Sequence, residues 1–464
     1  MAENGLHAVV FGSGMAGLLT ARVLSEFYGS VTVVERDVLP DRPEQRKGVP
    51  QGRHLHHFLS RGTQLIGELF PGILDELAAA GATVDDGDDL SRLYVRVAGY
   101  ELNPTGRLTD PGPLAAYQAS RPFVEFHLRR RVASLANVTI LDNHDVTELI
   151  ISADTVTGAR IINHANGITS TVDADLVVDT TGRASRTHTF LDSQSYGPVP
   201  QDRTPARWGY SSQLVHIPPG RINERMAFVS QGTSAPGAVL MAYEHDTWML
   251  SVSRPVDCGI PPKTFTEMLE AAVRILPRTI STALHDATPI GEIASSRATA
   301  GRWRRYDQVT RLPKGLLVLG DALCTLNPLY GQGMTMAALH ALALRDCLRA
   351  GETDLAQRFY SAAAKHIAPV WAMNEANERP AAPNPPRQAR LRSWMQRAAL
   401  AAATHDIVVA ERLLRVRNLI DPPTRLQDPA LLCRILLTNL RHRDPRPNLV
   451  ASTSTSASST KSDN

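Results

Sequence analysis

Three glycines near the beginning of the chain have the spacing of a phosphate-binding turn. Gly12, Gly14 and Gly17 follow a short apolar run over 8–11. In this GxGxxG pattern the first glycine allows a tight turn, the second lets the backbone approach a pyrophosphate, and the third lets a helix pack closely on a strand. The spacing therefore predicts that the chain binds a dinucleotide.

An acidic residue lies where the second strand of such a unit should end. The sequence predicts a helix over 15–28 that Gly29 stops. A strand over 30–34 follows, and Glu35 comes directly after it. A carboxylate at this point can accept hydrogen bonds from both hydroxyls of an adenosine ribose, and its charge disfavours a 2′-phosphate. We include the adjacent Arg36 in the predicted cofactor site.

A second strand, loop and helix are expected over residues 315–348. The strand ends at Gly320 and Asp321, and the helix begins near Gly331 and Gly333. A carboxylate at the strand end could accept a hydrogen bond from a ribityl hydroxyl. The free N–H groups at the start of the helix would favour the anionic edge of a reduced flavin. This pattern favours FAD over NAD as the dinucleotide.

Three stretches of the sequence resemble the flavin-binding motifs of the FAD-dependent monooxygenases. They are the glycine turn with Glu35, DLVVDTTGRASR at 175–186, and GDALCTLNPLYGQGM at 320–334. That superfamily includes aromatic hydroxylases, squalene-type epoxidases, flavin halogenases and geranylgeranyl reductases. The resemblance covers roughly residues 1–60, 116–190 and 290–350. It implies a fold in which a Rossmann-like domain holds FAD.

The resemblance also implies roles for single residues. Arg121 would contact FAD, and Val146 would hold the adenine through its backbone. The loop around Pro328 would lie against the edge of the flavin ring, and Met334 belongs to the same motif. The sequence alone locates no catalytic acid or base.

A basic and histidine-rich segment, RKGVPQGRHLHHFLSRG, spans residues 46–62. Arg46 and Lys47 could balance the charge of a pyrophosphate, or they could form a solvated basic pair. The histidines of the segment are His54, His56 and His57. No acidic residue or cysteine accompanies them, so we predict hydrogen bonding or substrate contact beside the flavin and no bound metal.

The resemblance implies an oxygenase, in which reduced FAD and O2 form a C4a-hydroperoxide whose distal oxygen is transferred to carbon. The segment 46–62, together with the other motifs, looks most like actinomycete epoxidases that oxidise polyene precursors of polyethers. We therefore expect epoxidation of a small hydrophobic secondary-metabolite precursor, as in antibiotic biosynthesis. Aromatic hydroxylation, reduction of isoprenoid double bonds and a non-catalytic FAD-fold binding protein remain alternatives. The WxWxIP signature of halogenases is absent.

The source of electrons is left open by one departure from the motifs. Aromatic hydroxylases carry an Asp-Gly pair in the middle motif, where this chain has Thr181 and Gly182. No second GxGxxG follows a strand. We therefore expect either NAD(P)H, bound without a Rossmann unit of its own, or a partner flavin reductase.

Length and composition limit the class of protein. A chain of 464 residues exceeds what one core usually serves. The net charge of +3 is too small to indicate a nucleic-acid partner. Four separated cysteines without a CxxC spacing argue against a disulfide framework or a zinc site and favour a cytoplasmic protein. No run reaches the roughly 18 apolar residues of a membrane span, and the glycine-rich start is a poor signal peptide.

The predicted fold class is α/β, with a Rossmann-like FAD-binding domain, an antiparallel-sheet substrate domain and a C-terminal helical extension. The predicted boundaries are 1–190 plus 290–350 for the FAD-binding domain, 191–289 for the substrate domain, 351–450 for the helical extension and 451–464 for a disordered tail. A proline-rich linker over 379–388 should split the extension, because prolines interrupt a helix.

Overall fold

A parallel sheet with buried, apolar strands forms one half of the molecule. The computed structural model describes residues 3–232, 235–297, 300–378 and 385–442, so the predicted tail lies outside the described residues. All neighbouring strands of this sheet run parallel, in the order β19-β11-β1-β2-β7. Their bounds are β1 (Glu3–Phe11), β2 (Tyr28–Val34), β7 (Val138–Leu141), β11 (Leu176–Asp179) and β19 (Leu316–Val318). The α/β fold class is confirmed.

The first helix, α1 (Met15–Leu24), ends earlier than the sequence predicts. Residue Tyr28 is 2% exposed and pairs with Glu3, so burial of its ring extends β2 toward the N-terminus. Gly29 consequently lies within β2 and does not stop the helix. The predicted boundary at residue 28 is wrong because tertiary packing of an aromatic side chain outweighs helix propensity.

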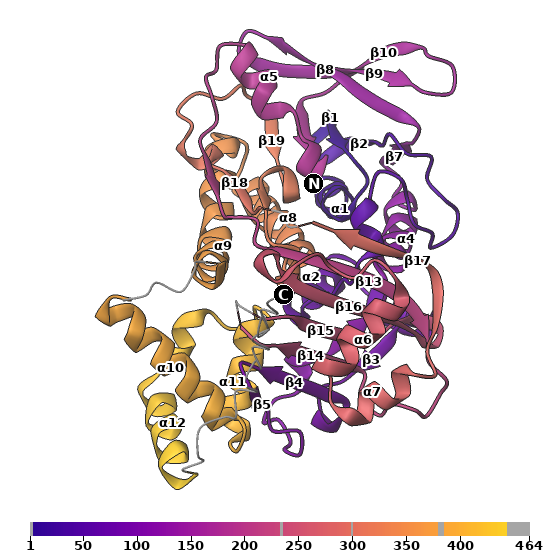
Figure 1. The fold of residues 1–464 in the computed structure, drawn as a ribbon. Coiled ribbons are helices and arrows are strands. Elements are labelled where there is room, and N and C mark those ends of the chain that lie inside the picture. Colours follow the sequence, from indigo (N-terminus) through magenta and orange to yellow (C-terminus); the bar gives the residue numbers. More distant parts are fainter. Residues whose placement is uncertain (1–2, 233–234, 298–299, 379–384, 443–464) are drawn as a thin grey trace, which may run out of the picture.

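Helices cover the parallel sheet and share one apolar core with it. They are α1, α2 (Ser60–Leu69), α3 (Ile73–Ala79), α4 (Arg121–Ala133), α5 (Thr187–Ser193), α8 (Gly333–Arg349) and α9 (Leu355–Glu378). Helix α8 packs on α1, α2 and α9. A small antiparallel sheet, β8 (His144–Ser152), β9 (Thr155–Asn163) and β10 (Thr169–Asp173), lies beside the parallel sheet at the top of Figure 1.

A seven-stranded sheet forms the second half, in the order β17-β13-β16-β15-β14-β4-β5. Its strands are β4 (Leu93–Val97), β5 (Tyr100–Glu101), β13 (Trp208–His216), β14 (Met226–Ser230), β15 (Gly237–Ala242), β16 (Thr247–Pro255) and β17 (Thr288–Ser296). We expected residues 93–101 within the FAD-binding domain, but β4 pairs with β14 and extends this sheet. Strand β17 also crosses the predicted boundary at 289. The remaining strands form two small sheets: β3 (Thr83–Asp85) with β6 (Ala116–Gln118), and β12 (Gln201–Arg203) with β18 (Arg302–Arg304) and β20 (Cys324–Thr325).

The two faces of the seven-stranded sheet have different neighbours. Leu250 and Val252 pack with α6 (Phe265–Ile275) and α7 (Arg278–Leu284) in one apolar cluster. Because successive side chains of a strand point to opposite faces, Ser251 and Ser253 point the other way, and they line a cavity. The sheet is therefore a wall between an apolar core and an open chamber.

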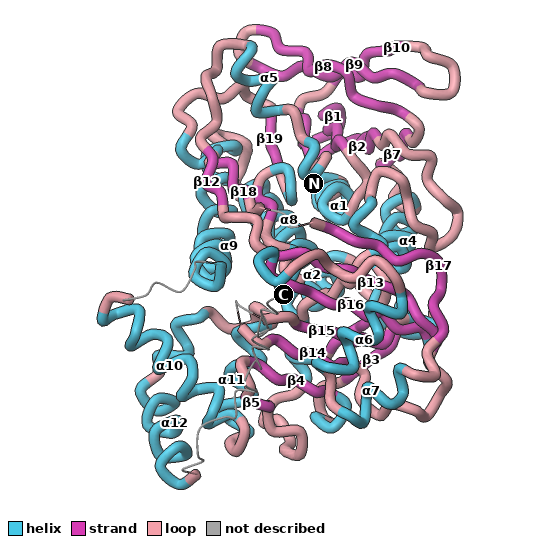
Figure 2. Tube along the Cα trace, viewed as in Figure 1, coloured by secondary structure: helices cyan, strands magenta, loops and turns pink. Residues whose placement is uncertain are grey.

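The C-terminal helices divide between the two halves. Helix α9 belongs to the core of the parallel sheet, whereas α10 (Arg387–Ala403), α11 (Ile407–Arg417) and α12 (Pro429–Arg441) pack against the β4 edge of the seven-stranded sheet. Figures 1 and 2 show α10, α11 and α12 grouped at the lower left, apart from α9. Among the described helices, none combines the length and hydropathy that crossing a membrane requires.

Candidate functional site

A cavity of about 1950 Å³ opens between the two large sheets and the C-terminal helices. Sites for one drug-sized ligand usually measure roughly 300–1,000 Å³, so this cavity has room for a cofactor and a second molecule. Of the predicted cofactor residues, all except Gly17 and Lys47 line it. The fold therefore gathers into one chamber residues that lie as far apart in the sequence as Gly12 and Met334.

The glycine turn has the geometry that its spacing predicts. Gly12 has a φ of +91°, and its N–H donates to the carbonyl oxygen of Val34 at 2.7 Å. A Cβ atom on Gly17 would lie 1.8 Å from the carbonyl oxygen of Gly12, so no other residue fits there. Gly14 begins α1 without a side-chain cap and faces the cavity. An uncapped helix N-terminus attracts an anion, as a pyrophosphate would be.

Glu35 lies at the end of β2 as an ionised acceptor. Its carboxylate accepts hydrogen bonds from the N–H and Oγ of Ser13 at 2.7 and 2.9 Å, and from the N–H of Asp37 at 3.0 Å. Burial raises the pKa of Glu35, but the charge of Arg46 and these hydrogen bonds outweigh burial and lower its pKa overall. The network already holds this carboxylate in place at the cavity wall.

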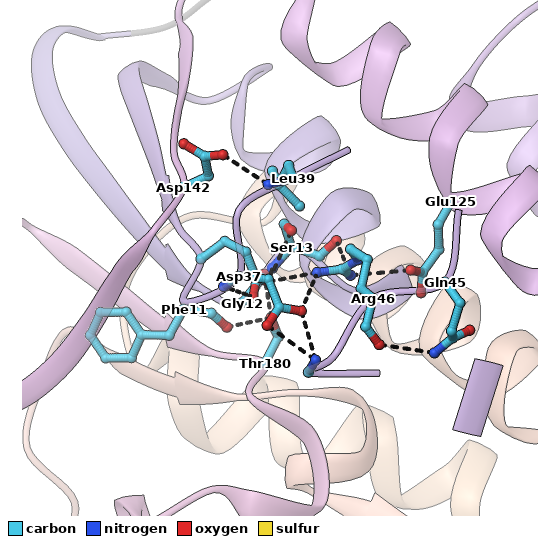
Figure 3. A network of polar contacts seen from close by, with 12 residues as sticks. Phe11, Gly12, Ser13, Asp37, Leu39, Gln45, Arg46, Glu125, Asp142 and Thr180 are labelled. Carbon is cyan, nitrogen blue, oxygen red and sulfur yellow. Dashed lines mark hydrogen bonds and ion pairs between the residues drawn. The ribbon is translucent and has the colours of Figure 1, made fainter. Parts of the chain in front are cut away.

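Arg46 is the centre of a buried ion-pair network (Figure 3). Its guanidinium lies 3.1 Å from Glu125 and 3.5 Å from Asp37, and its side chain is 4% exposed. Glu125 also accepts from Nε of Arg121 at 2.8 Å. Arg46 is therefore not a solvated residue, whereas Lys47 is exposed. Glu125 was not predicted as a site residue, although its i, i+4 spacing from Arg121 on α4 indicates such a pair.

Val146, the residue predicted to hold the adenine, lies on the strand that begins beside Glu35. The N–H of Glu35 donates to the carbonyl oxygen of Leu141 at 2.9 Å, and the N–H of His144 donates to the carbonyl oxygen of Glu35 at 2.9 Å. These bonds place the beginning of β8, and with it Val146, next to the end of β2. Arg36 is exposed and lines the same cavity.

The Asp321 carboxylate is half-buried in the cavity wall and has no hydrogen-bond donor among the described residues. Burial raises its pKa, against the lowering effect of Arg121 and Arg183. Cβ atoms on Gly182 and Gly333 would each lie 3.9 Å from its side chain, so the middle and third motifs meet here. An acceptor that faces the cavity without a donor fits the ribityl hydroxyl that the sequence predicts for it.

The loop before α8 directs a second helix N-terminus into the cavity. Pro328 is exposed there, and Gly331 has a φ of +68°, which turns the chain into the helix. Gln332 begins α8 without a side-chain cap and accepts a hydrogen bond from Asn374 of α9 at 3.0 Å. Met334 lines the cavity in the first turn. The N–H groups that we expected to favour an anionic flavin edge therefore face the chamber.

The histidine segment joins this loop to the seven-stranded sheet. The N–H of His56 donates to Oη of Tyr243 at 2.8 Å, and this hydroxyl donates to the carbonyl oxygen of His56 at 2.9 Å. Nδ1 of His54 lies 3.2 Å from Oγ of Ser212. His57 packs against Gly331, whose Cβ would lie 3.6 Å from it.

The imidazoles of this segment are neutral at physiological pH. Burial lowers the pKa of His54 to about 4, that of His56 to about 3 and that of His57 to about 4. Within the described ranges, no three side chains of the metal-binding types gather at one point. The segment therefore offers hydrogen-bonding groups to the chamber but no strong base.

The far wall of the chamber comes from the seven-stranded sheet and the last helices. Its lining includes Trp208, Tyr210, Phe228, Val239, Ser251 and Ser253 from the sheet, and Leu400, Leu413, Leu414 and Arg417 from α10 and α11. The C-terminal helices were not predicted to contribute to the site. Their contribution arises from packing against β4, which no local motif indicates.

Comparison with known proteins agrees with this architecture. The model of the FAD binding domain family matches residues 6–358. Protein Rv3254 of Mycobacterium tuberculosis is 38% identical over 451 residues, which cover 94% of each chain. Kynurenine 3-monooxygenase of Salinispora tropica is 25% identical over 362 residues, covering 74% of this chain and 73% of that protein.

Among solved structures, PqsL of Pseudomonas aeruginosa, a probable FAD-dependent monooxygenase, superposes with a TM-score of 0.59. It is 16% identical and covers 87% of this chain and 98% of its own, which shows the same fold. From the family match and these relatives, together with the site geometry, we conclude that the chain belongs to the FAD binding domain family and is an enzyme of the FAD-dependent monooxygenase class.

Proposed function

We propose that the protein inserts one oxygen atom from O2 into an alkene of an apolar substrate, giving an epoxide. FAD, when bound and reduced by NAD(P)H or by a partner flavin reductase, supplies the activation of O2. The substrate would lie between the loop over 328–334 and the seven-stranded sheet, where the cavity continues beyond the glycine turn. The protein would hold both molecules and exclude water from the space between them.

Two features of the chamber support the placement of FAD. The N-terminus of α1 and Glu35 suit the pyrophosphate and the adenosine ribose, with Val146 and Arg36 near the adenine. The Asp321 carboxylate suits the ribityl chain, because it faces the cavity without a donor among the described residues. The flavin ring would then lie at the start of α8, beside Pro328 and Met334, with the anionic edge facing the helix N–H groups.

The lining of the far wall is the observation that favours epoxidation of an alkene over hydroxylation of a phenol. The described residues that β13, β14, β15 and β16 contribute to the cavity are apolar, aromatic or hydroxyl side chains, without a carboxylate. The nearby histidines have pKa values of about 3 to 4, far below the operating pH that suits a general base. Oxygen transfer to an isolated alkene requires no base, whereas hydroxylation of a phenol gains from one.

Aromatic hydroxylation is the second candidate, and a different observation favours it. The kynurenine 3-monooxygenases of two Salinispora species are each 25% identical to this chain over 74% of its length. The same chamber and cofactor would serve that reaction if a ring carbon took the place of the alkene.

Product analysis under isotopically labelled O2 separates the candidates. Purified FAD-loaded protein would be given NADH, NADPH or a flavin reductase, and a panel that pairs alkenes with phenols of similar size, styrene and phenol among them. An epoxide with one labelled atom is expected. A labelled catechol would select the second candidate. A saturated product without label, or an oxygen derived from water, would contradict oxygenation altogether.

A further inference from the structure

Arg417 projects into the substrate part of the cavity from the last turn of α11. The centre of its guanidinium lies 4.0 Å from the centre of the Phe228 ring on β14, in a cation–π contact. Both side chains line the chamber, so the guanidinium is held between the C-terminal helices and the seven-stranded sheet. Stacking fixes the plane of the guanidinium and leaves the N–H groups at its edge available.

Within the described part of the chain this guanidinium has no counter-ion, unlike its neighbours on the same helix. Arg412 and Arg415 both pair with Asp421, and Arg415 also pairs with Asp110 at 3.2 Å. Among the described residues, Arg417 has no ion pair and no hydrogen bond. Burial lowers its pKa to about 10, so it remains charged at physiological pH. An enclosed charge without a partner is costly unless an anion or hydrogen-bond acceptor joins it.

Arg417 is linked through neighbouring side chains to the loop over 328–334 and not to the glycine turn. The side chain of the next residue, Asn418, lies near the imidazole of His57 and raises its pKa. His57 in turn packs against Gly331, which precedes α8. The side chain of His57 therefore lies between Asn418, which follows Arg417, and the loop that we expect beside the flavin ring. The glycine turn has its own arginines, Arg46 and Arg121, which are paired with carboxylates.

We propose that Arg417 binds the acidic group of the substrate, so that the substrate is an apolar organic acid. A planar carboxylate matches the two parallel N–H groups at the edge of a guanidinium, and such bidentate pairs are among the stronger polar contacts. The apolar body of the acid would extend over Phe228 and along Leu413 and Leu414. The inference rests on the proposed function in one respect, namely that the oxidised molecule occupies this chamber.

Matched acids and amides test the assignment without turnover. The FAD-loaded protein would be titrated by calorimetry with cinnamate against cinnamamide, and with oleate against oleamide. Because a hydrogen bond to a charged group contributes about 1.5–3 kcal/mol, we expect an acid to bind about tenfold to a hundredfold more tightly than its amide. Arg417→Gln should abolish this preference. Arg417→Lys should keep part of it, since an ammonium retains the charge but not the fork.

Two further variants keep the test decisive. Arg390→Gln, on α10, removes an exposed arginine that does not line the cavity and should leave the preference within about twofold of the wild-type value. Arg417→Met should keep or raise the melting temperature of the ligand-free protein, because it removes an uncompensated charge. A large fall in melting temperature would instead assign Arg417 a structural role and overturn the proposal.

The outcomes also separate this inference from the proposed function. If no acid of the panel binds better than its amide, or if Arg417→Gln retains the preference, the assignment of Arg417 is wrong even where labelled oxygen enters a substrate. If the acid preference depends on Arg417 but no substrate gains labelled oxygen, the substrate class stands and the proposed reaction fails.

Discussion

Removing the Asp321 carboxylate should weaken FAD binding without unfolding the protein. Among the described residues, this carboxylate accepts no hydrogen bond, so its truncation breaks none. Burial raises its pKa, which means that the ionised form is disfavoured in the cofactor-free protein. A hydrogen bond from a ribityl hydroxyl to a charged acceptor contributes about 1.5–3 kcal/mol. Asp321→Ala should therefore lower FAD affinity about tenfold to a hundredfold.

The assay is a titration of cofactor-free protein with FAD, followed by the quenching of flavin fluorescence. Asp321→Asn keeps an oxygen acceptor without the charge, so its affinity should fall between wild type and Asp321→Ala. Asp346→Ala removes an exposed carboxylate from the far end of α8 and serves as the matched control. The melting temperatures of both Asp321 variants without FAD should equal or exceed that of wild type. Wild-type FAD affinity in a stable Asp321→Ala protein would refute the role of this residue.

Three further predictions concern the rest of the site. Gly17→Ala should abolish FAD binding and destabilise the fold, because its Cβ would lie 1.8 Å from a carbonyl oxygen. Gly112→Ala, whose Cβ would meet nothing within 4 Å, should do neither. Equal Kd values of the two variants for FAD would contradict this. Arg46→Gln should lower the free energy of unfolding in urea by about 3–5 kcal/mol, since it leaves the carboxylates of Glu35 and Asp37 without a cation, and exposed Lys47→Gln should change it little; similar losses in both would count against a buried network. The pKa of His54 falls from 6.5 unfolded to about 4 folded, so its contribution to stability is present above pH 6.5 and is lost as the pH falls toward 4. As the pH falls from 6.5 to 4, the free energy of unfolding in urea should accordingly decrease less for His54→Gln than for wild type. Equal decreases in the two proteins would disprove the role of His54 in this pH dependence.

The sequence predicted those parts of the site whose spacing is local. Gly12 and Gly17 act within one turn, and Asp321 lies three residues after the end of β19, so each pattern is complete within a few residues. The α/β fold and the monooxygenase class followed from these motifs and from the family resemblance, and both are confirmed. Epoxidation, the electron donor and the individual cofactor roles remain predictions.

Features that depend on long-range contact could not be predicted in this way. Tyr28 extends a strand because its ring is buried, and β4 joins a sheet whose other main strands lie more than a hundred residues away. The spacing around Arg417 gives only weak evidence that its side chain faces the chamber. Arg417 lies three residues after Leu414 and four after Leu413, on the same face of a helix that contains other arginines. That it meets Phe228, from a different part of the chain, depends on how α11 packs against the sheet.

The split of the C-terminal helices gives the protein a modular architecture. The helix α9 shares a core with the parallel sheet and supports the loop before α8 through Asn374, whereas α10 and α11 form part of the far wall from a separate cluster. Substitutions in that cluster can therefore reshape what the chamber accepts without disturbing the residues expected to hold the cofactor. Relatives with the same N-terminal motifs can accordingly diverge in substrate through their last helices, and exchanging these helices is a direct route to altered specificity.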